Sequence, residues 1–187
     1  MSNLKVYHED KPSEALVDTS EGAEIARHLQ AIGVRFERWQ AAQPVAAGAS
    51  QDTVLTAYRQ PVDQLMRECS YKTADVISLT KDNPDKAALR QKFLNEHIHE
   101  EDEVRFFVDG RGLFYLHAQG KVYGVLCQKG DLISVPANTT HWFDMGAEPH
   151  LACIRLFTDP AGWVAKFTGS TIAEGFPMIP EPVAAVA

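Results

Sequence analysis

The residues of this chain that could do chemistry are concentrated in one short stretch, HIHEEDEVRFFVDGRG, which begins at His97. His99 follows two residues later, and Glu103 and Arg105 continue the same odd-numbered parity. Side chains alternate between the two faces of a strand, so these four would point to one side of a continuous strand. A bend within residues 100–102 would only need to preserve that direction. Two imidazoles and a carboxylate that converge are the ligand set of a non-haem Fe(II) centre with open coordination positions.

The alternative for this stretch is a solvated acidic loop that happens to contain two histidines. A second pattern argues against that alternative. Gly130 and Asp131 precede a strand-like run that ends at Pro136, and His141 follows five residues later. A turn, a strand and a histidine that opens the next strand would return a third imidazole to the first cluster. Together the two patterns predict a metal centre.

The elements that must position these residues fall into two groups along the chain. Up to about residue 95, apolar residues at helical spacing alternate with strand-like runs, and capping residues and prolines mark the helix starts. The predicted helices are 21–32, a segment from Ser50 to Tyr58, a segment from Pro61 to Met66 and a segment from Asn83 toward His97. The predicted strands in this part are 4–7, 34–39 and 74–79.

Beyond residue 103 the pattern changes to short strands of about five residues, separated by turn signals. These strands are predicted at 104–108, 113–117, 122–126, 132–135, 141–144 and 151–157. Such spacing is typical of an all-β sandwich or barrel. We therefore expect a mainly β fold with peripheral α-helices that pack outside one barrel.

The length of 187 residues fits a single domain. We expect one domain over residues 1–187, with a helical N-terminal decoration over about 1–95 and a β-barrel core with the metal site over about 96–160. A C-terminal tail is expected over about 176–187, where proline and alanine dominate.

Composition and charge limit the partners and the cellular location expected for the protein. The formal net charge of −7, without a cluster of Lys and Arg, argues against a nucleic-acid partner. The first fifteen residues contain no apolar signal-peptide core, and no apolar run approaches the length of a membrane span. Cys69, Cys127 and Cys153 form no CxxC pair and are expected to be buried free thiols of a reducing compartment. We expect a cytoplasmic monomer with no membrane partner.

The two histidine patterns resemble the two motifs of the cupin superfamily. The first cupin motif is HxH, three or four residues, Glu, six residues, Gly, and it is matched here by His97, His99, Glu103 and Gly110. The second is matched by Gly130, Pro136 and His141. Asp144 departs from the pattern, because cupins often have an asparagine shortly after the second-motif histidine. The resemblance implies a cupin-type double-stranded β-helix, a jelly-roll barrel with a metal inside.

A closer resemblance is carried by the run FLNEHIHEEDEVRFFVDGRGLFYLH, from Phe93 to His117. This run is similar to the signature region of the acireductone dioxygenases of the methionine salvage pathway, as are VRFERW at 34–39 and DVISL at 75–79. The likeness covers nearly the whole chain up to about Gly175. It implies that the metal ligands are His97, His99, Glu103 and His141. It further implies that Arg105 helps to form the substrate dianion, and it assigns metal incorporation and conformational relay to Glu96 and Asp102.

The same resemblance implies a metal-dependent dioxygenase that cleaves an acireductone, 1,2-dihydroxy-3-oxo-5-methylthiopent-1-ene, with O2. The implied cofactor is one Fe2+ or Ni2+ per chain. The Fe2+ form would give 4-methylthio-2-oxobutanoate and formate, and the Ni2+ form would give 3-methylthiopropanoate, formate and CO. Three histidines and a carboxylate leave two adjacent octahedral positions open, which suits a bidentate substrate. Arg105, a permanent cation, would stabilise and orient the enolate charge.

Several alternatives remain open. Arg105 could instead form a surface ion pair with Asp102 or Glu103. The chain could be another cupin, either a dioxygenase for a different substrate or a non-redox isomerase or ligand-binding module. Three aromatic residues are candidates for an apolar wall around the substrate tail, with core packing as the stronger alternative: Phe93, Phe143 and Trp163. Four histidines outside the motifs are expected at the surface or in packing: His8, His28, His117 and His150.

Overall fold

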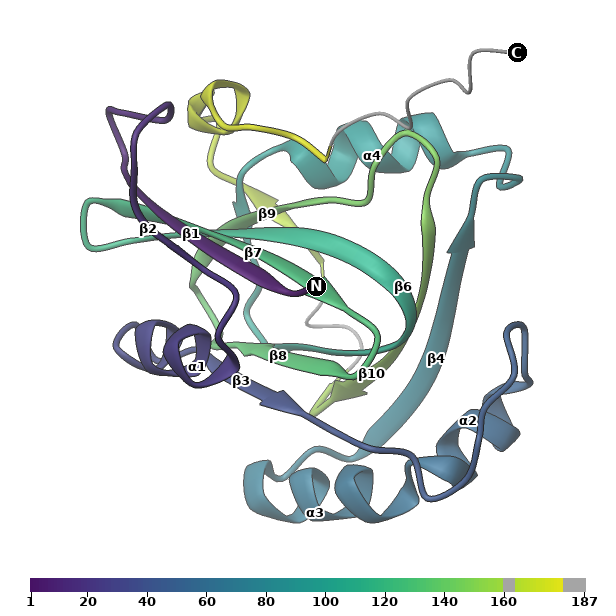
Figure 1. Ribbon diagram of the computed structural model, residues 1–187. Coiled ribbons are helices and arrows are strands. Elements are labelled where there is room, and N and C mark those ends of the chain that lie inside the picture. Colours follow the sequence, from purple (N-terminus) through teal and green to yellow (C-terminus); the bar gives the residue numbers. More distant parts are fainter. Residues whose placement is uncertain (160–163, 180–187) are drawn as a thin grey trace.

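The computed structural model describes residues 1–159 and 164–179, and it shows strands around a central barrel with helices at the periphery (Figure 1). The helices are α1 (Gly22–Gln30), α2 (Gln51–Ala57), α3 (Arg59–Cys69) and α4 (Lys86–Leu94). The strands are β1 (Asn3–His8), β2 (Ala15–Thr19), β3 (Arg35–Arg38), β4 (Thr73–Thr80), β5 (His97–Ile98), β6 (Glu103–Ala118), β7 (Lys121–Gln128), β8 (Asp131–Val135), β9 (Thr140–Asp144), β10 (His150–Phe157) and β11 (Lys166–Phe167). A 3₁₀-helix follows at Ile172–Gly175. The predicted mainly β class with peripheral helices is confirmed.

The longest strand, β6, takes part in two antiparallel arrangements. Its first half pairs with β8 and β10, and its second half, from Arg111, pairs with β7 and β9. On one side the order of strands is β4–β10–β6–β8–β3. On the other side it is β11–β5–β9–β6–β7–β1–β2. The shared strand thereby joins both walls of the barrel.

Two glycines explain why β6 can pass from one wall to the other. The strands predicted at 104–108 and 113–117 imply a turn between them at 109–112, and that prediction is wrong, because β6 continues through these residues. Gly110 has a φ of +71°, and a Cβ atom placed on it would lie 1.8 Å from the carbonyl oxygen of His150. A Cβ on Gly112 would lie 2.3 Å from the ring of Phe143. Both glycines therefore permit close approach rather than a chain reversal.

The strands of the first 95 residues extend both walls instead of standing apart from the barrel. β1 pairs with β7, β3 with β8, and β4 with β10 along its whole length. This pairing supports the proposal of a single domain. The four predicted helices are confirmed with shifted ends, and β2, β11 and the 3₁₀-helix are additions that the sequence did not predict. In Figure 1, α4 lies at the top of the barrel near β9, and α2 and α3 lie at the bottom beside β4.

Apolar side chains fill the barrel, with Phe107, Phe114 and Ile133 fully buried. Cys127 and Cys153 are buried free thiols, as predicted. Cys69 is exposed, so the prediction for it is wrong; it is the last residue of α3.

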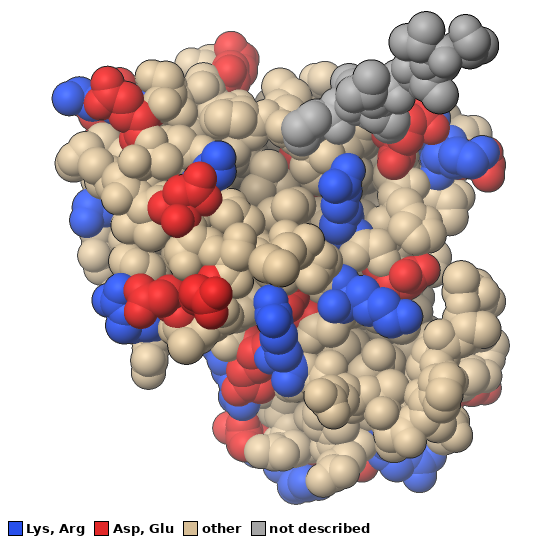
Figure 2. Space-filling view, viewed as in Figure 1, with Lys and Arg blue, Asp and Glu red and all other residues tan. Residues whose placement is uncertain are grey.

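The surface mixes both signs of charge. Acidic and basic side chains are interspersed over the face shown in Figure 2. Among the described residues, no helix is both long and apolar enough to cross a membrane.

The account of Gly110 predicts a large difference between two alanine substitutions. Gly110 and Gly120 share a φ of +71°, but a Cβ on Gly120 would meet no atom within 4 Å. Gly120→Ala should lower the free energy of unfolding by about 1 kcal/mol, the cost of the left-handed backbone alone. Gly110→Ala adds a clash with backbone and should cost about 3 kcal/mol or more. Urea unfolding of the two variants measures both values, and equal losses would contradict the close-approach account.

Candidate metal centre

Three imidazoles and one carboxylate converge inside the barrel. One ligand atom from each of four buried residues lies within 4.8 Å of the others: His97, His99, Glu103 and His141. β5 carries the first histidine, β6 begins at the glutamate, and β9 carries the last histidine. His97 and His141 are register partners across β5 and β9. The structure therefore brings together the two sequence patterns that predicted a metal site.

Backbone carbonyl groups orient two of the imidazoles. The Nδ1 atom of His97 lies 2.7 Å from the Asn95 carbonyl oxygen, and that of His141 lies 2.7 Å from the Thr139 carbonyl oxygen. A carbonyl oxygen can only accept, so each Nδ1 donates its hydrogen and each Nε2 keeps a lone pair for a metal. The Nε2 of His141 lies 2.8 Å from Glu103 Oε2. The rings and the carboxylate thus face the same point.

The charge states of these groups suit a divalent cation. Burial, together with the neighbouring His141, lowers the pKa of His97 to about 4. Burial alone would raise the pKa of Glu103, but the Arg105 guanidinium and the close imidazoles of His141 and His99 bring it well below its usual range. At neutral pH His97 is neutral and Glu103 is ionised, and these are the forms that bind metal ions. No cysteine belongs to the set, so it does not resemble a closed zinc site of the Cys-rich kind.

The strand is interrupted between β5 and β6, as predicted, and this break lets the ligands meet. β5 ends at Ile98 and β6 begins at Glu103, with bends between them. The break is fastened to the turn before His141, because the Asn138 amide donates to the His99 carbonyl oxygen at 2.8 Å.

Asp102 fastens the same break to two other segments. One of its carboxylate oxygens, Oδ1, accepts from the Ala137 amide at 2.9 Å. The other, Oδ2, accepts from the Tyr71 hydroxyl at 2.8 Å. Tyr71 lies between α3 and β4, so Asp102 joins that segment to the turn that leads to His141.

Arg105 lies inside the barrel beside the four ligands, with 8% of its surface exposed. Its Nε donates to Glu103 Oε1 at 2.6 Å, and its guanidinium carbon lies 5.0 Å from the centre of the Phe143 ring. The ion pair with Glu103 that the sequence left open therefore exists, but it is buried at the site and is not a surface pair.

A cavity of about 350 Å³ opens onto three of the four candidate ligands, His97, His99 and Glu103, and it is within the usual size of small-molecule sites. Its lining combines polar groups with an apolar wall: Ile77, Lys92, Phe93, His97, His99, Glu103, Arg105, Phe143, Arg155, Val164, Ala165 and Phe167. Two of the predicted wall residues are there, Phe93 and Phe143, with ring centres 6.2 Å apart. The third, Trp163, lies outside the described residues. Apart from the candidate ligands and Arg105, the sequence did not predict the other lining residues. Of these, only Ile77 lies in a segment that resembles the family, DVISL at 75–79.

Glu96 does not point at this cavity. It is buried, with Oε1 2.8 Å from His117 Nδ1, and its Oε2 accepts from the Thr168 hydroxyl at 2.6 Å. His117 in turn reaches Glu9 through its Nε2 at 2.8 Å. A histidine that was expected in ordinary packing thus bridges two carboxylates.

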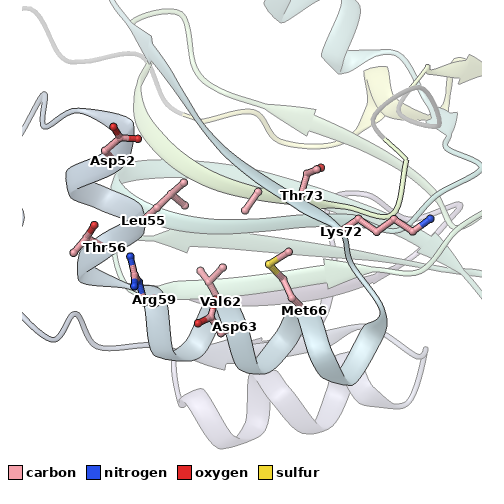
Figure 3. Close-up of a pocket in the computed structure, with 10 residues that line it drawn as sticks. Asp52, Leu55, Thr56, Arg59, Val62, Asp63, Met66, Lys72 and Thr73 are labelled. Carbon is pink, nitrogen blue, oxygen red and sulfur yellow. The ribbon is translucent and has the colours of Figure 1, made fainter.

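A larger cavity, about 530 Å³, lies elsewhere, between α2, α3 and β4 (Figure 3). It is lined by Asp52, Leu55, Thr56, Arg59, Val62, Asp63, Met66, Lys72, Thr73 and Ala74. These residues include neither histidine nor cysteine, and their two acidic and two basic side chains balance. Volume alone therefore does not locate the chemistry, which belongs to the smaller cavity with the converging ligands.

The chain is similar to known proteins over most of its length. A model described as the ARD/ARD' family matches residues 4–165. An acireductone dioxygenase of Pseudomonas aeruginosa is 58% identical over 96% of this chain and 99% of its own, and one of Stenotrophomonas maltophilia is 58% identical over 95% and 96%. A solved acireductone dioxygenase from Bacillus anthracis, with a cadmium ion in its active centre, is 27% identical and covers 89% of this chain and 98% of its own, with a TM-score of 0.77. This likeness confirms the predicted cupin-type barrel.

The geometry predicts that each of the four ligands is needed for metal binding. His141→Ala removes one nitrogen donor and should lower metal affinity by at least about tenfold, the lower end of the loss seen even for outer-shell partners. His150→Ala is the matched control, because His150 is exposed on β10 and belongs to no ligand cluster of the described residues. Metal content after dialysis, measured by mass spectrometry, distinguishes the two. If His141→Ala kept its full metal content, His141 on β9 would not be a metal ligand.

Proposed function

The chain belongs to the ARD/ARD' family, and on that premise we propose that His97, His99, Glu103 and His141 hold one Fe2+ or Ni2+ ion for the cleavage of an acireductone by O2. The protein is an acireductone dioxygenase, an oxidoreductase. One observation carries the proposal about the site: the four positions that the family resemblance names as ligands converge within 4.8 Å, and His97, His99 and Glu103 line a cavity together with Arg105.

The donor set fits the proposed ions. Imidazole nitrogens suit iron and nickel, and a carboxylate adds a hard oxygen donor. A divalent ion held by these four residues would supply Lewis-acid polarisation of a chelating substrate. The protein contributes the fixed directions of the donors, because backbone carbonyl groups hold the rings of His97 and His141.

Arg105 is proposed to orient the substrate and to stabilise its enolate charge. Its Nε is engaged by Glu103, and its guanidinium group also carries donors on two terminal nitrogens. A guanidinium group stays protonated at any physiological pH and offers a planar fork to two oxygens. Arg105 is 8% exposed, and a cation so shielded from solvent stabilises developing negative charge more strongly than it would in water.

The cavity has a polar end and an apolar end. The ligands and Arg105 form the first, and Ile77, Phe93 and Phe143 contribute to the second. An acireductone of the proposed kind has the same division, with oxygens at one end and a methylthioethyl tail at the other. The tail would cover apolar surface, which favours binding by about 25 cal/mol for each Å² buried.

The remaining predicted residues are proposed to act indirectly. Asp102 links Tyr71 to the turn before His141, and these hydrogen bonds support a role in relaying conformational change. A role of Glu96 in metal incorporation remains a proposal from the family resemblance, since its carboxylate is engaged by His117 and Thr168. The monomeric state and the cytoplasmic location also stay predictions of the sequence.

Oxygen uptake tests the proposed function directly. The purified protein, loaded with Fe2+, should consume acireductone and O2 in a ratio of one to one and release formate and 4-methylthio-2-oxobutanoate. The Ni2+ form should release CO, formate and 3-methylthiopropanoate instead. Metal-free protein reloaded with each ion is assayed for CO in the headspace and for the keto acid in solution. An isomerase or a binding module would consume no O2, and identical products from both ions would contradict the dependence on the metal.

Substitution of Arg105 separates substrate handling from metal binding. Arg105→Ala should keep most of the metal and lower kcat by about 10²–10³-fold, the usual cost of one preorganised charge-stabilising donor. Arg105→Lys should recover part of that loss, because an ammonium group lacks the planar fork. Arg111→Ala, an exposed arginine on the same strand, is the control. If metal content falls in parallel with kcat in Arg105→Ala, the residue supports the ligands and does not act on the substrate.

A further inference from the structure

We propose that Thr168 and Glu96 form a latch that holds residues 164–168 against the metal cavity, so that Val164 and Phe167 make a wall that selects the apolar tail of the substrate. The proposal rests on the proposed function, because it concerns the same cavity and the same substrate. It assigns Thr168 and Glu96 as positioning residues and Val164 and Phe167 as specificity-determining residues.

The segment that carries this wall has few regular attachments. β11 consists of two residues and pairs with β5, with Lys166 opposite Ile98 and Phe167 opposite His97. The ion pair between Lys166 and Glu100 joins two side chains that are more than half exposed. Pairs of that kind contribute little to stability. The position of Phe167 beside the metal ligands therefore depends on what holds the chain just after it.

Thr168 supplies that attachment. Its amide donates to the Glu96 carbonyl oxygen at 3.1 Å, and its hydroxyl donates to Glu96 Oε2 at 2.6 Å. Both bonds reach the residue directly before the first metal ligand. Glu96 is 4% exposed, and a hydrogen bond to a group so shielded from solvent is stronger than the same bond in water.

The carboxylate that receives Thr168 is itself fixed from the other side. Glu96 Oε1 lies 2.8 Å from His117 Nδ1, and the Nε2 of that ring lies 2.8 Å from Glu9 Oε2. His117 belongs to β6, and Glu9 follows β1, so two elements of the barrel hold Glu96 in place. Residues 164–168 are thus hydrogen-bonded to a carboxylate that other elements of the barrel also hold in place.

The wall itself has the chemistry of an apolar subsite. Phe167 is 50% exposed and Val164 is 68% exposed, yet both line the metal cavity. The Phe167 ring lies edge-on to His97, with ring centres 5.9 Å apart. Apolar side chains left open to solvent at the mouth of a cavity gain free energy when an apolar ligand covers them. The ligand that fits them is an uncharged alkyl or alkylthio chain whose polar end faces Arg105 and the metal ligands.

The test compares two substrates in variants of Thr168. One substrate carries the methylthioethyl tail, and the other is an acireductone whose tail is cut to a methyl group. Thr168→Val keeps the shape of the side chain and removes the hydroxyl, Thr168→Ser keeps the hydroxyl, and Thr80→Val is the matched control at the exposed end of β4. Metal content and hydrogen–deuterium exchange of the amides in 164–170 are measured on the same samples.

In Thr168→Val, kcat/KM for the long substrate should fall roughly tenfold, mainly through a higher KM, and for the short substrate by less than about twofold. Amide exchange in 164–170 should become faster, and metal content should stay that of the wild type. Thr168→Ser should restore the selectivity, and Thr80→Val should change nothing.

Other outcomes overturn the proposal. Equal losses for both substrates, or loss of metal in Thr168→Val, would place Thr168 in the support of the metal centre. Unchanged kinetics would show that the latch does not position the wall. If the wild-type protein consumes O2 with neither substrate, the proposed function fails and the role of the wall fails with it. If the wild-type protein is active but no Thr168 variant loses its selectivity for the long substrate, the wall is refuted and the proposed function stands.

Discussion

The arrangement of this protein depends on one buried carboxylate. Glu103 is 3% exposed, and an ionised carboxylate inside a barrel is very costly unless cations or hydrogen-bond donors surround it. Arg105 donates to one of its oxygens at 2.6 Å, and His141 lies 2.8 Å from the other. The site therefore holds the carboxylate ionised in a place where water does not compete. That state is what makes Glu103 useful as a ligand for a divalent ion.

Keeping those partners in place is the task of the strands around them. Glu103 and Arg105 lie on one face of β6 because they are two residues apart. His141 arrives on β9, which pairs with the far half of the same strand. β6 can serve both walls because Gly110 lets it approach the backbone of β10. Asp102 and the Asn138 amide then fix the break between the first two histidines and the glutamate.

The cavity divides its work between charge and apolar surface. Arg105 and the ligands occupy one end, whereas Phe93, Phe143 and Phe167 lie around the rest. The two ends are held by different parts of the chain. The charged end is built from β5, β6 and β9, while part of the apolar end comes from a segment near residue 165 that is attached to the barrel through Glu96.

The sequence by itself determined the chemical identity of the site. The spacing of His97, His99 and Glu103 and the later His141 announced a ligand set, because local strand periodicity fixes which side chains share a face. The parity of Arg105 with Glu103 placed both on one face of the strand for the same reason. Helices such as α1 were readable because Ile25 and Leu29 recur at helical spacing.

Only the tertiary structure decided what surrounds those residues. A strand of two residues, such as β11, has no periodicity to read, so Phe167 could not be placed beside His97 from sequence. The bridge from Glu9 through His117 to Glu96 spans more than a hundred residues, and no local pattern encodes such a pairing. A glycine such as Gly110 is typical of a turn, yet it lies within a strand. Glycine permits both a chain reversal and the close approach of a neighbouring backbone, so the residue type alone does not distinguish the two. Long-range strand pairing makes that distinction, and it exists only once the chain has folded.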